Sequence, residues 1–296
     1  MSHDAVVGNF LGLPESDEKP DIIIASIPYE LTTSYGQGTE NGPAACIDAS
    51  TQVELYDDLL KDNLPAGAIL RTVTPWNGVG NTLHEQLNGI RKYAKEQFSS
   101  DAFPIFLGGE HGILPAIIKA INKPVTIVQI DAHADLRDEL DGEEFSHACA
   151  AARALDSGAI GLYQLGIRAY SKEELEKINS DNRIKTWFCR DIMSPCGGEK
   201  YWNEWIFEIS KIKGPVHLTI DIDGLDGSIV PATGTPVPGG LSFWHAIQTI
   251  ETLIEQCNVI SADVNEIVPQ KGSNLTQFTA AMLVTKIIAA RINKIK

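Results

Sequence analysis

The chain lacks features that mark several classes of protein. Its 296 residues contain no apolar run of the roughly 18 residues that a membrane span requires, so we expect no membrane segment. The N-terminal sequence MSHDAVVGNF has no basic region followed by an apolar one, so we expect no secretory signal. The five cysteines are scattered, odd in number and form no CxxC pair. Free thiols in a reducing compartment explain this pattern best, and we expect a cytoplasmic protein.

Basic residues are also scarce. Lys and Arg number 24 against 39 Asp and Glu, which gives a formal net charge of −15. Binding to nucleic acid needs a basic face that neutralises phosphates, so we expect no nucleic-acid partner. An acidic protein instead attracts cationic ligands. Hydrophobic residues make up 43%, which is enough for a buried core and excludes disorder for the bulk of the chain.

Apolar segments typical of buried strands alternate with helical patterns along the whole chain. We expect helices at 82–98, from 171 onward, at 243–256 and at 276–293, the first two opened by the capping-box pairs Thr82–Glu85 and Ser171–Glu174. This order predicts a single α/β domain over 1–296, with three α/β/α layers and a mostly parallel sheet of about eight strands. The expected strands are 21–27, 68–73, 103–107, 125–131, 161–167, 183–187, 216–222 and 258–264.

Histidines and carboxylates follow four of these strands. Because ligands bind at the carboxyl ends of parallel strands, we expect these side chains to meet at one edge of the sheet. Acidic side chains that alternate along a strand end share one side and repel each other unless a positive charge lies between them. A metal ion supplies that charge. The six candidate ligands are His111, Asp131, His133, Asp135, Asp221 and Asp223.

The composition of this set indicates which metal it suits. Six ligands with bridging carboxylates can hold two divalent ions about 3.5–4 Å apart. Four carboxylates and two imidazoles without a thiolate favour a hard ion, so two Mn²⁺ per chain is our first expectation. Fe, Co, Ni and Zn stay open as alternatives.

These motifs resemble the arginase–agmatinase family of ureohydrolases over nearly the whole chain. The segments that carry the resemblance are GGEHG at 108–112, DAHAD at 131–135, DIDGLDGSIVPATGTPVPGG at 221–240 and PYELTTSYGQGTENGP at 28–43. The resemblance implies an arginase/deacetylase-like fold and a binuclear manganese hydrolase that splits a small cationic guanidino compound into urea and an amine. It also implies assembly into a homo-trimer or homo-hexamer.

The resemblance also assigns roles to individual residues. The six candidate ligands match the family's metal ligands by position. His147 matches the histidine that transfers a proton, and Glu266 matches the acid that holds the guanidinium. No ligand position is lost, and the departures from the family pattern concern rate and substrate. They are Gly112 for Ser or Thr, Gly227 for Pro, Ala232 for Gly and Ala152 for Arg.

One position bears on the substrate. Arginases carry Asn two residues after the last Asp of the DAHAD-type motif, whereas this chain carries Arg137. The stretch 135–149 resembles agmatinases, which implies hydrolysis of agmatine to putrescine and urea in polyamine biosynthesis. Arginine, guanidinobutyrate, guanidinopropionate or guanidine stay open as substrates. Two other classes also stay open, namely a metal-dependent amide deacetylase and a non-catalytic binding protein built on the same scaffold.

Overall fold

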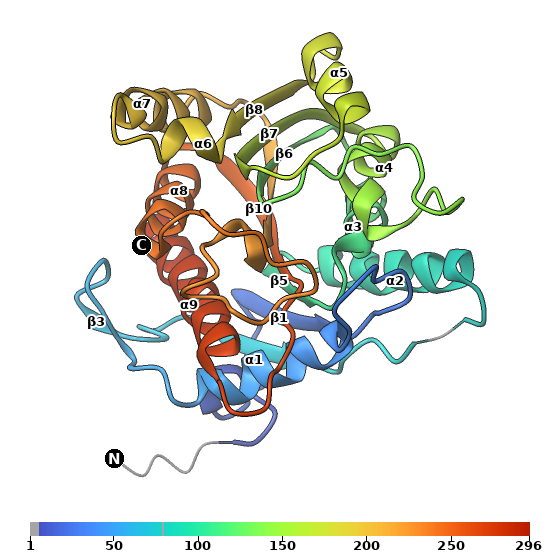
Figure 1. Ribbon diagram of the computed structural model, residues 1–296. Coiled ribbons are helices and arrows are strands. Elements are labelled where there is room, and N and C mark those ends of the chain that lie inside the picture. The colour runs from blue at the N-terminus through green and yellow to red at the C-terminus, as the bar shows by residue number, and fades with distance from the viewer. Residues whose placement is uncertain (1–5, 79) are drawn as a thin grey trace.

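The computed structural model describes residues 6–78 and 80–296 and is built around an eight-stranded sheet (Figure 1). The strand order is β4-β1-β5-β10-β9-β6-β7-β8, and every pairing in it is parallel. Residues 1–5, part of the segment considered for a secretory signal, lie outside the described residues. The strands are β1 (Ile22–Ile27), β4 (Leu70–Val73), β5 (Phe103–Gly108), β6 (Val125–Ile130), β7 (Ala159–Ile167), β8 (Ile184–Phe188), β9 (Pro215–Asp221) and β10 (Asn258–Asn265).

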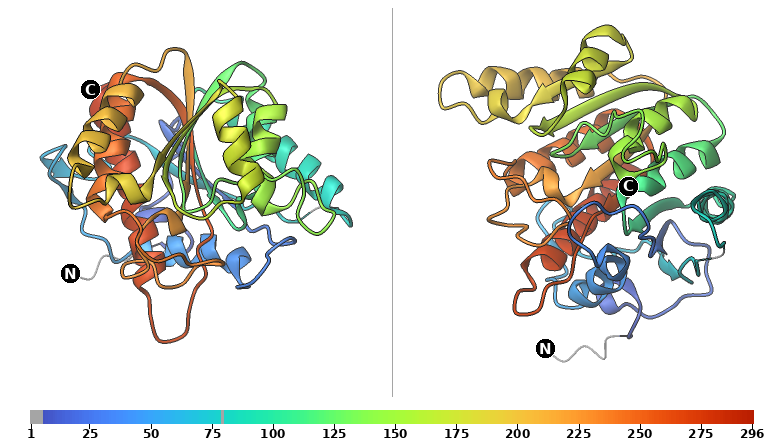
Figure 2. Two further views of the ribbon diagram at one scale, coloured as in Figure 1. Left: turned by 45° about the horizontal axis from the view of Figure 1, so that its top comes forward. Right: turned by 45° about the vertical axis from the view of Figure 1, so that its right-hand side comes forward.

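Helices cover both faces of this sheet, which gives three layers (Figure 2). Strands β1, β5 and β6 are buried at every residue, as expected for parallel strands enclosed on two sides. One helical layer contains α2 (Leu83–Phe98), α3 (Leu114–Ile121), α4 (Ala150–Asp156) and α5 (Lys172–Ser180). The other contains α1 (Gly42–Ser50), α6 (Cys189–Ile192), α7 (Gly198–Ile209), α8 (Phe243–Gln256) and α9 (Leu275–Ile295).

The predicted elements are present. All eight expected strands form within a few residues of their expected bounds, and the sheet is fully rather than mostly parallel. Both capping boxes form: the side chains of Thr82 and Ser171 accept hydrogen bonds from the amides of Glu85 and Glu174, whose carboxylates reach back in return. Five helices, α1, α3, α4, α6 and α7, and the short antiparallel pair β2 (Tyr56–Asp57) and β3 (Asp62–Asn63) were not predicted.

Helix α9 bears on the expectation that the chain has no membrane segment. It is 21 residues long with a mean hydropathy of 1.3 in its most apolar window, so by length and composition it is apolar enough to cross a membrane. In the fold, 72% of that window is buried inside the protein, and the helix packs against α1 and α8. Its Lys286 forms an ion pair with Asp57, with 2.7 Å between Nζ and Oδ2. The burial identifies α9 as a core helix.

Candidate metal centre

The carboxyl ends of four central strands form the candidate site. Strands β5, β10, β9 and β6 are consecutive neighbours in the sheet, so the loops that follow them meet at one edge. This is where open parallel sheets bind ligands. His111 follows β5, Asp131 follows β6, Asp221 ends β9, and Glu266 follows β10. The sheet topology therefore brings together segments that are up to 155 residues apart.

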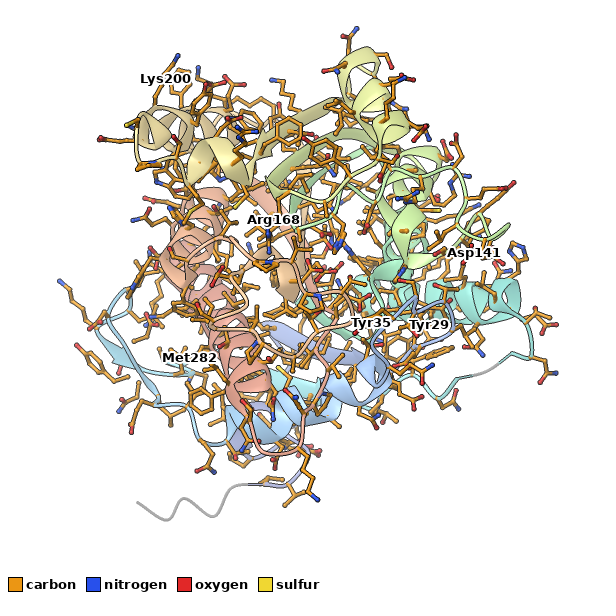
Figure 3. The ribbon with its side chains drawn as sticks, in the orientation of Figure 1. Tyr29, Tyr35, Asp141, Arg168, Lys200 and Met282 are labelled. Atoms are coloured by element: carbon orange, nitrogen blue, oxygen red, sulfur yellow. The ribbon has the colours of Figure 1, made fainter. Side chains whose placement is uncertain are left out.

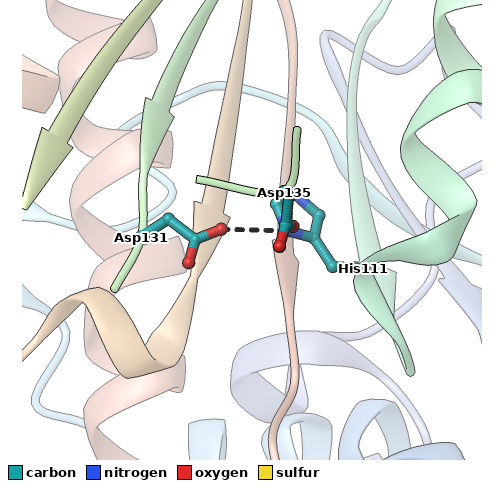
Figure 4. Close-up of side chains that lie close together, drawn as sticks. All are labelled: His111, Asp131 and Asp135. Carbon is teal, nitrogen blue, oxygen red and sulfur yellow. Dashed lines mark ion pairs between the residues drawn. The ribbon is translucent and has the colours of Figure 1, made fainter. Parts of the chain in front are cut away.

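The first group of side chains surrounds His111. Its Nδ1 atom lies 3.1 Å from Asp131 Oδ2 and 3.1 Å from Asp135 Oδ2 (Figure 4). Asp221 Oδ2 lies 3.7 Å from the same nitrogen. All four side chains are buried. One imidazole and three carboxylates thus converge on one small volume, in the manner of ligands around a cation.

The second group shares a member with the first. His133 Nδ1 lies 3.0 Å from Asp223 Oδ2 and 3.7 Å from Asp131 Oδ1. Asp131 therefore presents one carboxylate oxygen to His111 and the other to His133. A carboxylate divided between two ligand groups is the arrangement that bridges a pair of metal ions. All six candidate ligands lie in these two overlapping groups.

A buried hydrogen-bond chain fixes the orientation of the His111 ring. His111 Nε2 lies 2.8 Å from Thr219 Oγ1, and the Thr219 hydroxyl donates to Asp263 Oδ1 over 2.6 Å. Because the Thr219 hydroxyl donates its proton to the hydrogen bond with Asp263, it accepts a hydrogen bond from His111 Nε2–H. Asp263 also contacts His217 Nε2 at 2.6 Å. The proton of His111 is thus directed to Nε2, and the lone pair of Nδ1 is left for the centre of the site.

The electrostatics of the cluster favour positive charge at its centre. Burial raises the pKa of Asp221 well above its ordinary value, and repulsion from Asp223 and Asp131 adds to this. Burial and the charge of Asp131 raise the pKa of Asp135 to about 7. Burial lowers the pKa of His133, but hydrogen bonds to Asp131 and Asp223 outweigh it and raise that pKa to about 11. Buried carboxylates that lie this close together repel one another, and a cation between them stabilises their charged forms.

These residues fit divalent metal ions. His111 Nδ1 is buried and has no hydrogen-bond partner, although two carboxylate oxygens lie within 3.1 Å. A nitrogen lone pair that faces carboxylate oxygens without a hydrogen bond is suited to a shared cation. Among the described residues, the donors gathered here are imidazole nitrogens and carboxylate oxygens, which suit Mn²⁺ and its neighbours in the first transition series.

Glu266 lies beside the first group and is held rigidly. Its Oε1 atom accepts a hydrogen bond of 2.8 Å from the His111 backbone amide, which ties the carboxylate to the turn that carries His111. Its backbone adopts a φ of 64°, a left-handed conformation that non-glycine residues rarely adopt, and Asp135 has a φ of 54°. Such backbone strain costs about 1–3 kcal/mol and persists where the surroundings impose it, often at functional sites.

His147 lines the same cleft as Glu266. The cleft has a volume of about 300 Å³, and its wall also includes His111, His133 and Asp135. His147 opens a 3-10 turn over His147–Cys149, and its backbone amide donates to Thr32 Oγ1 over 2.9 Å. Burial lowers the pKa of His147 to about 4, with a further contribution from His111 and His133. The ring is therefore neutral at pH 7 and able to accept a proton.

Sequence reasoning missed several residues that organise this site. Arg168 lies near the middle of the molecule (Figure 3), and its guanidinium donates to the backbone carbonyls of Asp223 and Val237 over 2.7 and 2.6 Å. It thereby ties the loop that carries Asp223 to the loop that closes over it. Thr219 and Asp263 were likewise not singled out. All of these contacts join residues distant in the chain, and no local motif signals them.

Comparisons with known proteins point to one family. The family model described as Arginase family matches residues 20–290. The chain is 34% identical over 277 residues to an N(1)-aminopropylagmatine ureohydrolase of Synechocystis sp., covering 90% of this chain and 88% of that protein. It is 32% identical over 279 residues to an agmatinase of Pyrococcus horikoshii, covering 93% and 94%.

Solved structures share the fold. The agmatine ureohydrolase of Thermoplasma volcanium superimposes with a TM-score of 0.80 at 27% identity, covering 93% of this chain and 91% of that one. The formimidoylglutamase of Bacillus subtilis superimposes with a TM-score of 0.86 at 20% identity, covering 99% and 94%, and supports the fold alone. On the match to the family model and on these relatives, the chain belongs to the arginase family.

Proposed function

We propose that this protein is an amidinohydrolase that uses two divalent metal ions to cleave a guanidino compound into urea and an amine. The observation that carries the proposal is the pair of ligand groups that share Asp131, next to a carboxylate and a neutral imidazole in one cleft. Membership of the arginase family supports it.

In this proposal each ligand group would hold one ion. The first ion would be held by His111, Asp131, Asp135 and Asp221. The second ion would be held by His133, Asp131 and Asp223. The oxygen-rich donor set favours Mn²⁺. Bound divalent ions would supply hydroxide near neutral pH, because they lower the pKa of a coordinated water from 15.7 toward about 7.

The remaining steps belong to Glu266 and His147. The free side of the Glu266 carboxylate pairs with the cationic guanidinium and orients its carbon, while His111 N–H holds the other oxygen. The leaving amine has a pKa of about 10 and must depart protonated. His147 is neutral, so its imidazole can accept the proton released by the attacking water and return it to the leaving nitrogen.

We further propose that the substrate is agmatine, which yields putrescine and urea and places the enzyme in polyamine biosynthesis. Two features support a substrate with a distal ammonium. Agmatinases are among the relatives at 30% identity or more, and the largely exposed segment 138–144 (DELDGEE), whose Leu140 lines the cleft, is rich in acids. The Synechocystis relative favours N(1)-aminopropylagmatine as the second candidate.

The proposed enzyme is cytoplasmic and assembles as a homo-trimer or homo-hexamer. Sedimentation velocity of the purified full chain tests the assembly, and a monomer at micromolar concentration would contradict it.

Urea release after Mn²⁺ loading tests the activity. The panel comprises agmatine, N(1)-aminopropylagmatine, arginine, guanidinobutyrate, guanidinopropionate and guanidine. We expect agmatine to have the highest kcat/KM. Faster turnover of another member would overturn agmatine but retain the class. No urea from any member, with two ions bound per chain, would refute the proposed function and favour a non-catalytic binding protein.

A control variant and a second assay separate the remaining alternatives. Glu266→Gln keeps the shape of the side chain but loses its charge, so it should retain both ions and release little urea. Deacetylation of an acetylated polyamine with one ion per chain would favour the deacetylase alternative, because such sites usually hold a single Zn²⁺.

A further inference from the structure

Glu110 is a buried carboxylate that the proposed reaction does not use. It stands beside His111 in the GGEHG turn and is fully enclosed. Its Oε2 accepts from the Leu31 amide over 3.0 Å, and its Oε1 accepts from the Thr32 amide over 2.5 Å. The amide of Glu110 in turn donates to Tyr29 O over 2.8 Å. Three hydrogen bonds, two to the Glu110 side chain and one from its backbone amide, thereby join the GGEHG turn to the segment 28–43.

Thr32 extends this connection to His147. The Thr32 hydroxyl accepts the hydrogen bond from the His147 amide, while the Thr32 amide donates to Glu110. The chain of contacts runs from Glu110 through Thr32 to the backbone of His147, across 115 residues of sequence between the last two.

The GGEHG turn supports His147 from a second side. A Cβ placed on Gly112 would lie 3.8 Å from the Cα and 3.8 Å from the N of His147, so the two backbones pack closely there. The 3-10 turns that begin at His111 and at His147 are in contact. One turn of five residues therefore contacts His147 directly through Gly112 and indirectly through Glu110.

We propose that Glu110 and Thr32 are positioning residues that hold His147 over the cleft, so that one turn sets both a metal ligand and the proton-transfer group. The kinetic part of this inference rests on the role proposed for His147. Its physical basis is that a displacement of about 1 Å at a reacting group can cost about 10²-fold in rate. A buried carboxyl group that accepts two backbone hydrogen bonds makes a stiff anchor, since breaking either of them leaves a buried polar atom without a partner.

The test compares Thr32→Val, which removes the hydroxyl, with Thr32→Ser, which keeps it. Amide hydrogen exchange at His147 is the first measurement and needs no substrate. We expect Thr32→Val to speed exchange at this amide about tenfold or more, the loss of about one hydrogen bond, and Thr32→Ser to restore protection. Glu110→Gln serves as a second variant, because its amide cannot accept from both Leu31 and Thr32 and should expose those two amides.

Kinetics are the second measurement. With the best substrate of the panel, we expect Thr32→Val to lower kcat about tenfold, with KM and bound metal unchanged, and Thr32→Ser to recover most of the rate. In a His147→Ala background, Thr32→Val should cause no further loss, because its effect passes through the missing ring.

Two results would overturn the inference. Unchanged exchange at the His147 amide in both Thr32→Val and Glu110→Gln would show that the tether is absent. An equal loss of kcat from Thr32→Val with and without the His147 ring would show that Thr32 acts elsewhere. Failure of the proposed function gives a different result, since the wild type would then release no urea while its amide exchange still responded to Thr32→Val.

Discussion

Replacing Thr219 by valine tests whether the buried chain behind His111 prepares that ring for metal. Valine matches threonine in shape but cannot accept a hydrogen bond. The His111 Nε2–H would then lose its acceptor at 2.8 Å in a fully buried setting. The ring can recover by moving its proton to Nδ1, which lies 3.1 Å from two carboxylate oxygens. That proton would occupy the position that the lone pair must keep free for a cation.

The magnitude follows from these contacts. A buried donor without a partner costs about 1–3 kcal/mol, and loss of a partner that orients a metal-binding histidine weakens affinity about 10–100-fold. We therefore expect Thr219→Val to lower the binding affinity for the ion assigned to His111 about 10–100-fold, which corresponds to about 1.4–2.8 kcal/mol. The affinity for the ion assigned to His133 should fall much less, because His133 is not part of this hydrogen-bond chain. Competition with a fluorescent chelator, in metal-free buffer, resolves the two affinities.

Thr219→Ser is the matched control, because serine retains the hydroxyl that accepts from His111 and donates to Asp263. It should bind both ions within threefold of the wild type. The reasoning is refuted if Thr219→Val binds both ions as the wild type does. It is also refuted if the serine and valine variants lose affinity equally, since the hydroxyl would then be irrelevant.

Three further predictions concern other parts of the site. His133→Ala should reduce bound Mn²⁺ from two ions toward one per chain by elemental analysis, and unchanged metal content and turnover would contradict its role as a ligand. Gly109→Ala should destabilise the fold by about 3 kcal/mol or more in urea unfolding, because a Cβ would lie 2.1 Å from Tyr29 O; Gly112→Ala, with 3.5 Å to Tyr29, should change stability by less than about 1 kcal/mol. The pKa of Asp226 is lowered from its ordinary 3.8 to about 2. The cause is hydrogen bonds from the Ser228 side chain and amide and from the amides of Gly239 and Gly240. The ionised Asp226 carboxylate therefore stabilises the fold fully above about pH 5, and this stabilisation is lost as the pH falls toward 2. The difference in free energy of unfolding between wild type and Asp226→Asn should shrink over that interval. A difference independent of pH would contradict this prediction.

Local sequence patterns predicted the eight strands of the main sheet, four of the helices and the ligand candidates for clear physical reasons. Strands enclosed on both faces must be apolar throughout, so their runs stand out, and the polar residues that follow them are conspicuous. The alternation in DAHAD signals that its acids share one side of a strand end. Helix α3, in contrast, is only eight residues long and is buried except at Lys119, and so short an apolar run cannot be told from a buried strand by its pattern alone.

What the sequence could not supply is the tertiary geometry. The division of the two Asp131 oxygens between the imidazoles depends on how the segments that follow β5 and β6 meet at the edge of the sheet. The left-handed backbone of Asp135 and Glu266 is imposed by packing rather than by residue type. The hydrogen bonds of Arg168 and Glu110 join segments far apart in the chain, and neither residue stands in a pattern that predicts its partners.

The position of β10 has a consequence for how the molecule is made on the ribosome. In the sheet order, β4, β1 and β5 form one half and β9, β6, β7 and β8 the other, and only β10 joins them. His111 belongs to the first half, and the other five ligand candidates belong to the second. A nascent chain that has not yet released Asn258–Asn265 therefore lacks the strand that joins these halves. Of these strands β10 is the last to be synthesised, so His111 joins the other five ligand candidates only after β10 has formed.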